Sequence, residues 1–423
     1  MPTRNIFIIL GCLIVSLVCY SEYHKNRYSD TIAEAMTIIE TQALKEFSRR
    51  ELFRAAMRGM VSQIDEHSAF IDGKEKVSEF RESLDQEFGG IGIIVDSDTR
   101  DGLTVITPLP GTPAAKAGMQ PGDVIVSVNQ QPTKNLSRAA SIKLIKGPVG
   151  ESVKIEFRHL GESITQSAEI VRQIVEVPSV KGDYRNSTLN WIFRIEDQQN
   201  IGYIRLSTFG EKTVKEMKQA LVTINGNVDG LILDLRENPG GLLETAIQLA
   251  DLFIDEDMIV ETRRRDGEVE DRYMATSKLQ FDKEIPMVIL INGRSASASE
   301  IVAACLQDHG RAIVCGERSW GKGTVQNVIT MENQKSILKI TTASYWRPSG
   351  KNIHRSEKTT TEDEWGVVPT PGFEVKLTAE QQFAVLRYRN FRDRKNIGGE
   401  VSQKIEKLED AQLNKAIDYL LSL

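Results

Sequence analysis

Three serines that alternate with alanines carry the strongest signal for nucleophilic chemistry in this chain. The apolar run 287–291 and the Asn-Gly dipeptide after it predict a strand that ends in a turn. Ser295, Ser297 and Ser299 follow, and apolar residues then recur at helical spacing, so we expect a helix to begin just after Ser297. A serine on a strand-to-helix turn stands beside free backbone N–H groups, which suits a nucleophile next to an oxyanion hole.

A lysine between two glycines follows the serine run. Gly321 and Gly323 flank Lys322, so the backbone can bend tightly and the lysine side chain is uncrowded. Such a lysine can serve as the base for a serine, but it can equally be a solvated loop residue or an anion contact. The serine run has a plain alternative as well, in which Ser299 only caps the helix.

The two segments together are similar to a known family. Residues 295–300 read Ser-Ala-Ser-Ala-Ser-Glu and residues 321–326 read Gly-Lys-Gly-Thr-Val-Gln, which resembles the carboxyl-terminal processing proteases. These are Ser/Lys-dyad peptidases that carry a PDZ domain. The resemblance implies that Ser297 is the nucleophile, that Lys322 is the general base and that Gln326 supports the lysine.

A lysine base needs an environment that keeps it neutral. The pKa of lysine is near 10.4 in water, and lowering it to about 7–8 requires destabilising the cation by ~4 kcal/mol. We expect Trp320 and Val325 to exclude water, and Gln326 to orient the amine without adding charge. Glu300 falls in the first helical turn, where it favours the helix dipole, and we expect it to point away from the lysine; Glu317 is the other nearby acid that could interfere.

A second strand–turn–helix unit precedes the serine run. The apolar strand 230–235 leads into an Asn-Pro-Gly-Gly turn at 238–241 and then into a helix. The repetition predicts a layered α/β sheet with flanking helices over residues 173–395, and the resemblance implies that this sheet is of the crotonase and tail-specific-protease kind. The resemblance implies an oxyanion hole made by the glycine amides of this turn and the amide of Ala298. Whether Gly240 or Gly241 donates stays open.

A compact module of short strands lies earlier, at residues 87–172. Five short strands and two helices in this range resemble a PDZ domain, inserted before the protease core. Its glycine loop, with the four residues Phe88, Gly89, Gly90 and Ile91, could hold a peptide carboxylate while the peptide adds as a strand. A hairpin turn that requires glycine is the alternative. The resemblance also implies that Arg172 couples peptide capture to the active site; otherwise it is a linker cation.

The two ends of the chain read as helical. Helical spacing over 26–86 and a last helix within 396–423 predict segments that pack on another domain or subunit, and the resemblance implies a homodimer. The uncharged stretch 6–20 predicts a signal anchor or a signal peptide within 1–25. Both interpretations predict that the rest of the chain is exported to the periplasm or another extracytoplasmic space. The anchor interpretation also predicts that the N-terminus is held in a membrane.

Composition and residue types disfavour several other classes. The net charge of −6 gives no indication of nucleic-acid binding. Of the five histidines only His309 and His354 lie in the predicted core, neither with an evident acid partner near Ser297, so a Ser/His/Asp triad is disfavoured. No metal-binding spacing occurs and no cofactor is predicted. Cys305 and Cys315 are expected to pack as small buried hydrophobes without a disulfide framework.

The sequence therefore predicts a serine endopeptidase that cleaves exported proteins near apolar C-terminal tails captured by its PDZ domain. Its partners would be a substrate with a free apolar C-terminus, a second copy of the chain, a membrane and an adaptor protein. Two alternatives belong to other classes: a catalytically idle or latent peptide-binding scaffold, and a carrier of lipophilic ligands.

Overall fold

The structure is a computed structural model that falls into two compact units. It describes residues 10–12, 14–16, 27–99, 102–109, 111–188, 190–276, 279–356, 359–360, 363–394 and 408–423. One unit joins residues 1–77 to 326–341, and the other joins 78–325 to 342–423. The predicted signal segment 1–25 lies outside the described residues except for 10–12 and 14–16. Within the described part, no helix has the length and apolar character needed to span a membrane.

The first unit contains two N-terminal helices and a small antiparallel sheet. The helices are α2 (Arg27–Gln42) and α3 (Arg49–Val61), and β1 (Ala69–Asp72) pairs with the part of β21 that runs from Ser336 to Lys339. Asp72 at the end of β1 is buried and forms ion pairs with Arg50 and Arg54 of α3. Helical spacing alone did not predict β1, because this strand exists only through its pairing with a segment far along the chain.

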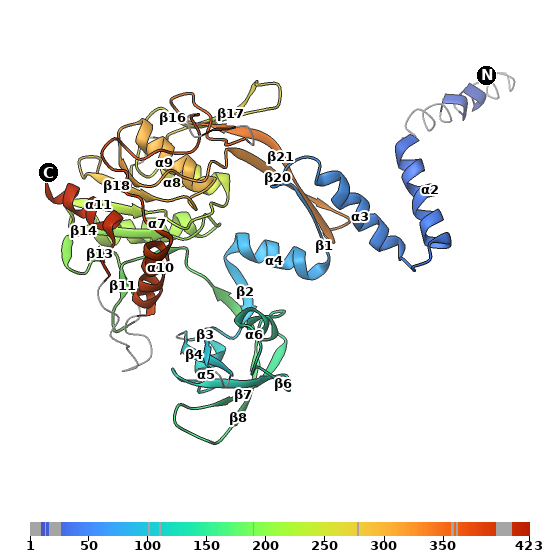
Figure 1. The fold of residues 1–423 in the computed structure, drawn as a ribbon, viewed down its shortest axis with the longest axis horizontal. Helices are drawn as coiled ribbons and strands as arrows, with labels where there is room; N and C mark the ends of the chain where they lie inside the picture. Colours follow the sequence, from blue (N-terminus) through green and yellow to red (C-terminus); the bar gives the residue numbers. More distant parts are fainter. Residues whose placement is uncertain are drawn as a thin grey trace. The chain divides into compact units, whose positions relative to one another are not determined.

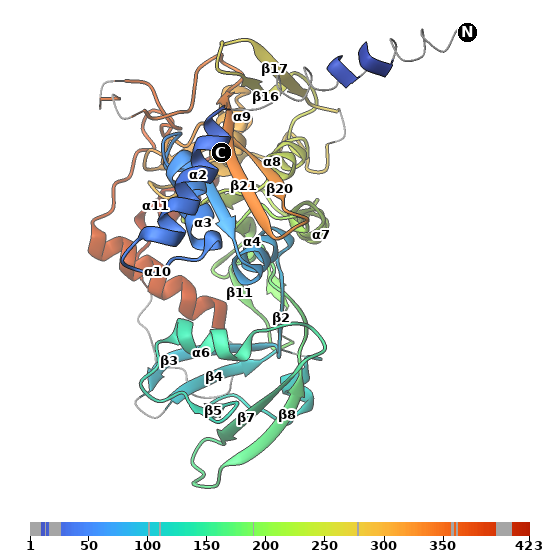
Figure 2. The same cartoon turned by 90° about the vertical axis from the view of Figure 1, so that its right-hand side faces the viewer.

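The PDZ-like module occupies the part of the second unit shown in Figure 2 around β3 to β8. Its sheet has the order β3-β4-β5-β7-β8, with β6 paired to β5, so β3 is an edge strand. Alternating residues of these strands form a separate apolar core that includes Val105, Ile125 and Ile155. The bounds are β3 Ile93–Thr99, β4 Gly102–Pro108, α5 Pro113–Lys116, β5 Val124–Val128, β6 Gln131–Pro132, α6 Arg138–Ile145, β7 Ser152–Arg158 and β8 Gln166–Val171.

A two-stranded ladder marks where the chain enters and leaves this module. β2 (Glu87–Gly90) pairs antiparallel with β9 (Gln173–Glu176), and helix α4 (Lys74–Asp85) precedes β2. The predicted glycine loop at 88–90 is therefore wrong as a loop, because Phe88, Gly89 and Gly90 are paired strand residues. The predicted first strand of the module, 91–95, begins two residues later as β3.

The centre of the second unit is a sheet of four parallel strands. β14, β15, β18 and β19 lie in this order, with two short antiparallel strands, β10 and β13, at β14. Helices α7, α8 and α9 connect or follow these strands, as the strand–turn–helix repeats predicted (Figure 1). The bounds are β10 Val180–Lys181, β13 Arg194–Ile195, β14 Gln198–Leu206, α7 Thr213–Ile224, β15 Gly230–Asp234, α8 Leu243–Ala250, β18 Met287–Ile291, α9 Ala298–Asp308 and β19 Ile313–Gly316.

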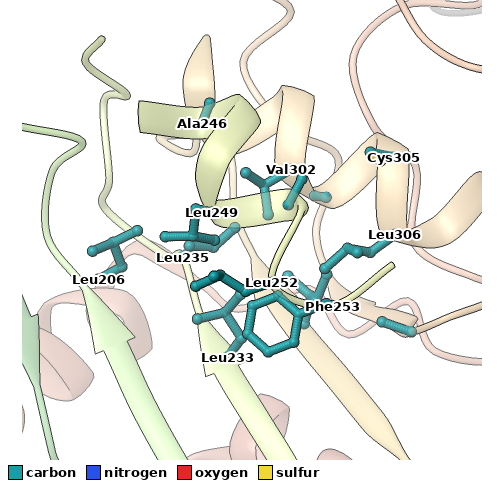
Figure 3. Packing of buried hydrophobic residues seen from close by; sticks show 14 of the residues in the cluster. Leu206, Leu233, Leu235, Ala246, Leu249, Leu252, Phe253, Val302, Cys305 and Leu306 are labelled. Carbon is teal, nitrogen blue, oxygen red and sulfur yellow. The ribbon is translucent and has the colours of Figure 1, made fainter. Parts of the chain in front are cut away.

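The parallel sheet is apolar on both faces because helices cover each of them. On one face, Leu206, Leu233 and Leu235 pack against side chains of α8 and α9 such as Leu249 and Val302 (Figure 3). On the other face, the alternate strand residues Tyr203, Ile232 and Leu290 pack with Leu413 and Ala416 of the last helix. Strands buried on both faces read as continuous apolar runs, which explains why they could be recognised in the sequence.

The remaining elements form two further small sheets and two helices. β16 pairs with β17 and with residues 344–346 of β21, and β11 pairs with β12. The last helix lies within the predicted segment 396–423, whereas α10 was not predicted. The bounds are β11 Tyr184–Arg185, β12 Trp191–Ile192, β16 Met258–Arg263, β17 Val269–Met274, β20 Thr324–Met331, β21 Ser336–Trp346, α10 Ala379–Arg394 and α11 Ala411–Leu421.

Candidate active site

Two neighbouring strand ends bring the serine run and the Asn-Pro-Gly-Gly turn together. β15 and β18 pair in parallel, with Asp234 opposite Leu290, so the turns that follow both strands leave the same edge of the sheet. This edge is where ligands bind in open α/β sheets. The sequence located both turns correctly, and the parallel register makes them adjacent.

Ser297 occupies a strained turn at the start of α9. The helix begins at Ala298, as predicted, and Ser297 precedes it with φ 56° and ψ −115°. A non-glycine residue in such a conformation costs on the order of 1–3 kcal/mol unless its surroundings impose it. Here the N–H of Ser297 donates to Glu300 Oε2 at 2.8 Å, and the N–H of Ala296 donates to the carbonyl of Asn238 at 3.0 Å.

The hydroxyls of the three serines have different partners. Ser295 Oγ donates to the carbonyl of Leu235 at 2.8 Å, and Ser299 Oγ donates to the carbonyl of Asn238 at 3.0 Å. Both hydroxyls thus fasten the turn to the neighbouring strand end. Ser299 is the second residue of α9 rather than its cap, so the helix-cap alternative for Ser299 is wrong. Within the described part of the chain, Ser297 Oγ makes no comparable donation to a main-chain carbonyl.

A buried tyrosine lies beside the Ser297 hydroxyl. Tyr345, near the end of β21, is 4% exposed, and its phenol interacts with the side chain of Ser297. Burial raises the pKa of this phenol above its ordinary value, so the group remains neutral. The N–H of Tyr345 also donates to the carbonyl of Gly323 at 2.8 Å. The sequence identified Tyr345 only as part of a motif, and strand pairing brings it to the site.

The Asn-Pro-Gly-Gly turn requires both of its glycines. Gly240 has φ +97°, and a Cβ there would lie 2.8 Å from Ser297 Cβ. Gly241 has φ +154°, and a Cβ there would lie 2.1 Å from the carbonyl oxygen of Phe209. No side chain can occupy either position without moving the backbone. The turn therefore approaches the Ser297 turn as closely as main chain allows.

The amides of this turn are not equivalent. The N–H of Gly240 donates to Asn238 Oδ1 at 2.9 Å. Within the described part of the chain, the N–H groups of Gly241 and Ala298 donate to no acceptor. The sequence left open whether Gly240 or Gly241 donates to an oxyanion. The geometry favours Gly241, because the amide of Gly240 is already hydrogen-bonded to Asn238 and is not available to a ligand.

Asn238 joins the ends of three strands, a role that sequence reasoning missed. Its side chain is fully buried, and Nδ2 donates to the carbonyl of Leu206 at the end of β14 at 2.8 Å. Its own carbonyl accepts the N–H of Ala296 and the hydroxyl of Ser299. The Asn-Pro-Gly-Gly motif was the available signal, since asparagine often bonds to backbone groups in turns.

The loop that carries Lys322 also depends on its two glycines. Gly321 has φ +87°, and a Cβ there would lie 2.8 Å from the Trp365 ring. A Cβ at Gly323 would lie 2.2 Å from the backbone nitrogen of His354. Lys322 itself is half-buried, and its N–H donates to Glu300 Oε2 at 2.8 Å. The segments that carry Trp365 and His354 pack closely against this loop. This packing requires glycine on both sides of Lys322, in addition to the tight bend of the backbone.

The prediction that Glu300 points away from the lysine is wrong. Its carboxylate accepts from the backbone N–H groups of both Ser297 and Lys322. The residue does lie in the first turn of α9, as expected, but the tight turn at Ser297 brings the carboxylate under the lysine loop. Burial raises the pKa of Glu300 to about 7.

The other predicted neighbours of the lysine differ in burial. Trp320 is 51% exposed, so its ring does not form the dry wall that was expected, whereas Val325 is half-buried against the apolar core. Gln326 lies in β20, and its Nε2 donates to Thr341 Oγ1 at 3.2 Å. The support of Lys322 by Gln326 stays a prediction.

The predicted peptide-binding residues of the PDZ-like module are packed together. Ile91 is buried, the N–H of Gly147 donates to the carbonyl of Gly89 at 3.1 Å, and the Lys146 ammonium lies 3.8 Å from the centre of the Phe88 ring. A Cβ on Gly89 would lie 2.0 Å from the carbonyl of Gly147, so this glycine is needed for close backbone approach. Carboxylate binding by these residues stays a prediction.

Arg172 binds carbonyls at the end of α6. It is buried, and its guanidinium donates to the carbonyls of Ile145 at 2.8 Å, Ser152 at 3.2 Å and Leu144 at 3.3 Å. All three partners belong to the PDZ-like module. Its proposed coupling to the active site stays a prediction, with helix capping as a second use of the same side chain.

The two core histidines lie on different segments. His309 follows α9, and its Nε2 is 2.8 Å from the carbonyl of Met258, which agrees with the expected place at the helix C-terminus. His354 packs its backbone against Gly323. Cys305 and Cys315 are buried and free, as expected.

Comparison with known proteins identifies the class to which this fold and site belong. A model of peptidase family S41 matches residues 200–367, and a PDZ domain model matches residues 104–159. The chain is 34% identical over 357 residues to a carboxy-terminal-processing protease of Bartonella bacilliformis, covering 82% of this chain and 78% of that protein. It is 32% identical over 318 residues to a carboxyl-terminal-processing protease of Synechocystis, covering 75% and 72%.

Solved structures share the fold. The crystal structure of an S41 protease from Bacteroides fragilis has a TM-score of 0.50 at 14% identity, with 92% of this chain and 96% of that chain covered. The chain is thus a serine peptidase with an inserted PDZ domain. It belongs to peptidase family S41 as a carboxyl-terminal processing protease, and the predicted family and fold class are confirmed.

Proposed function

We propose that this peptidase cleaves exported proteins near apolar C-terminal tails, with Ser297 as nucleophile and Lys322 as general base. One observation carries the assignment of the nucleophile. Ser297 lies on a strained turn at the N-terminus of α9, and unlike Ser295 and Ser299 its hydroxyl donates to no main-chain carbonyl in the described part of the chain. Strain at a functional position is expected where it presents a reacting group.

The proposed reaction uses Ser297 and Lys322 in the following order. Its Oγ attacks the carbonyl carbon of the scissile bond, and its proton passes to the neutral amine of Lys322. The resulting ammonium protonates the leaving amine as the C–N bond breaks, which leaves an acyl-enzyme. Water then attacks the ester as Lys322 takes a proton from it. The resulting ammonium protonates Ser297 Oγ as the ester C–O bond breaks, so the carboxylic product departs and the neutral amine is restored.

The oxyanion hole is assigned to the amides of Gly241 and Ala298. Both N–H groups lack an acceptor in the described part of the chain, and they come from the two turns that meet at the sheet edge. Donors of this kind, already oriented before reaction, stabilise the charge that develops on the carbonyl oxygen. One such donor contributes ~10²–10³ in rate.

The PDZ domain would capture the substrate tail by strand addition. β3 is an edge strand, and the apolar side chains of Ile93 on β3 and Ile142 on α6 are half-buried against the module core. An extended tail paired with β3 could place an apolar side chain against them. Ile142→Asp should therefore weaken binding of an apolar-tailed peptide by at least about tenfold, measured by titration calorimetry, without affecting cleavage of a short tailless peptide.

The location and assembly of the protein are part of the same proposal. An uncharged N-terminal stretch supports export and membrane anchoring. Exposed apolar side chains on α2, among them Ile32, Ile38 and Ile39, support a homodimer through the N-terminal helices. An adaptor protein that presents substrates would fit a protease with a separate binding module.

Cleavage of an unfolded reporter with an apolar tail by the full-length protein tests the proposal. Ser297→Ala should abolish cleavage. Ser299→Ala is the matched control, because it loses one hydrogen bond worth about 1 kcal/mol and should stay within about tenfold of wild type. Equal cleavage by Ser297→Ala and wild type would exclude Ser297, and tail binding with no cleavage by wild type would support the idle scaffold.

A further inference from the structure

The side chain of Glu300 is fully buried and receives four hydrogen bonds. Oε2 accepts the N–H of Ser297 at 2.8 Å and the N–H of Lys322 at 2.8 Å. Oε1 accepts the N–H of Gly321 at 2.6 Å and the hydroxyl of Ser319 at 2.5 Å. One carboxylate thus joins the turn that carries Ser297 to the loop that carries Lys322.

We propose that Glu300 is a positioning residue for the cleavage reaction, whose carboxylate holds the Lys322 loop on the Ser297 turn. A single oxygen atom bridges the two backbone positions, so their separation depends on this side chain. Reacting groups that are misplaced by about 1 Å can lose 10²-fold in rate. The inference rests on the proposed function, because it assumes that Ser297 and Lys322 act together.

Only a carboxylate satisfies all four donors. A glutamine offers one acceptor oxygen, and its NH₂ group would face N–H donors across the other contact. A protonated carboxyl has the same defect, because its O–H can no longer accept. Hydrogen bonds to an ionised group are about twice as strong as neutral ones, which offsets the cost of burying the charge.

Ser319 and the turn at 366–367 hold the Glu300 carboxylate from its other side. Ser319 Oγ, which donates to Glu300, also accepts the N–H of Val367 at 2.7 Å. Gly366 has φ +62°, and a Cβ there would lie 2.8 Å from Ser319 Oγ and 3.4 Å from Glu300 Oε1. The turn at 366–367 therefore closes over the carboxylate, so water has little room to replace a lost bond.

The contacts of the Glu300 carboxylate reach Lys322 through its backbone N–H. The groups that contact its oxygens are three backbone N–H groups and one hydroxyl, contributed by α9 and the 319–322 loop. The cations in and next to that loop are Lys322 and Arg318, and Arg318 lies over the Trp365 ring with its Cζ 4.6 Å from the ring centre. With its oxygens occupied by backbone donors, the carboxylate acts on the position of Lys322 through the main chain.

Glu300→Gln in the full-length protein tests the proposal, with Glu317→Gln as the matched control. Glu317 Oε1 accepts the N–H of Leu377 at 2.9 Å, so it is a nearby acid with partners outside the site. Glu300→Gln should lower kcat on the tailed reporter about 100-fold and leave KM within threefold. Glu317→Gln should change neither by more than threefold. A kcat within threefold of wild type for Glu300→Gln would overturn the proposal.

The pH dependence of kcat gives a second test, in which the wild-type enzyme alone can contradict the proposal. If both Glu300 and Lys322 must lose a proton, log kcat should rise with a slope of two at acid pH, and Glu300→Gln should show a slope of one. A slope of one in the wild type, with circular dichroism confirming the fold, would contradict a requirement for the carboxylate. Failure of the proposed function is separate, because it would appear as cleavage by Ser297→Ala.

Discussion

Arg236 and Asp410 form a buried bidentate ion pair that fastens the last helix to the central sheet. Arg236 Nη1 and Nη2 each lie 3.0 Å from an oxygen of Asp410, the residue that caps α11. Arg236 follows β15 and also binds Asp234 at the end of that strand, with Nη2 2.7 Å from Oδ2. The same strand end thus supports the helix on one face and leads into the glycine turn of the active site.

Arg236→Ala should destabilise the protein strongly. The substitution leaves Asp234 and Asp410 buried with too few donors, and breaking a buried ion pair in this way costs about 3–5 kcal/mol. Urea unfolding followed by circular dichroism measures the change. Arg264→Ala is the control, because its pair with Glu268 is exposed and should contribute nothing measurable. Equal midpoints for the two variants would contradict the prediction.

Stability should fall in acid because of the same cluster. Burial by itself would raise the pKa of Asp234, but the Arg236 guanidinium and the Tyr203 hydroxyl hold that pKa at about 2. A carboxyl group with a lowered pKa contributes stability above its unfolded pKa near 3.9, and this contribution is lost as the pH falls through 2. We expect the free energy of unfolding to drop between pH 4 and pH 2, with a smaller drop for Asp234→Asn. If the free energy of unfolding of Asp234→Asn fell as steeply with pH as that of the wild type, the prediction would be contradicted.

Gly241→Ala should abolish most of the activity. A Cβ would meet the Phe209 carbonyl at 2.1 Å, and the turn would have to move the amide assigned to the oxyanion hole. Loss of one such donor lowers kcat by ~10²–10³. Gly293→Ala is the control, because this nearby glycine has no atom within 4 Å of an added Cβ and should keep wild-type kcat. Comparable kcat values for both variants would refute the assignment.

Tyr345→Phe should lower kcat by about three- to tenfold. The change removes the polar group that interacts with the Ser297 side chain and keeps the buried ring, and a polar contact of this kind contributes about 0.5–1.5 kcal/mol. Steady-state kinetics on the tailed reporter, with thermal unfolding to verify the fold, measures the effect. Tyr419→Phe on α11 changes a phenol elsewhere and should have no effect on kcat. An unchanged kcat for Tyr345→Phe would show that the contact has no role in the reaction.

The sequence predicted those parts of the site that depend on local pattern. Ser297 at a strand-to-helix turn and the paired glycines at 240–241 could be read directly, because apolar runs, helical spacing and turn residues specify them within a few positions. The sequence also predicted that the PDZ domain precedes the protease core. The exceptions were β1 and the paired β2, since a short strand forms only when a distant partner is present.

Tertiary structure alone decided how the distant parts of the site meet. The parallel register of β15 and β18 places Asn238 against the serine turn, and β21 brings Tyr345 to Ser297. The orientation of Glu300 depends on a strained backbone and on the lysine loop above it, so helical position alone predicted it wrongly. Local sequence determines which residues can react and which turns carry them. Contacts between residues far apart in the chain determine which amides remain free and which carboxylate joins the two halves of the site, because those contacts form only when the sheet is assembled.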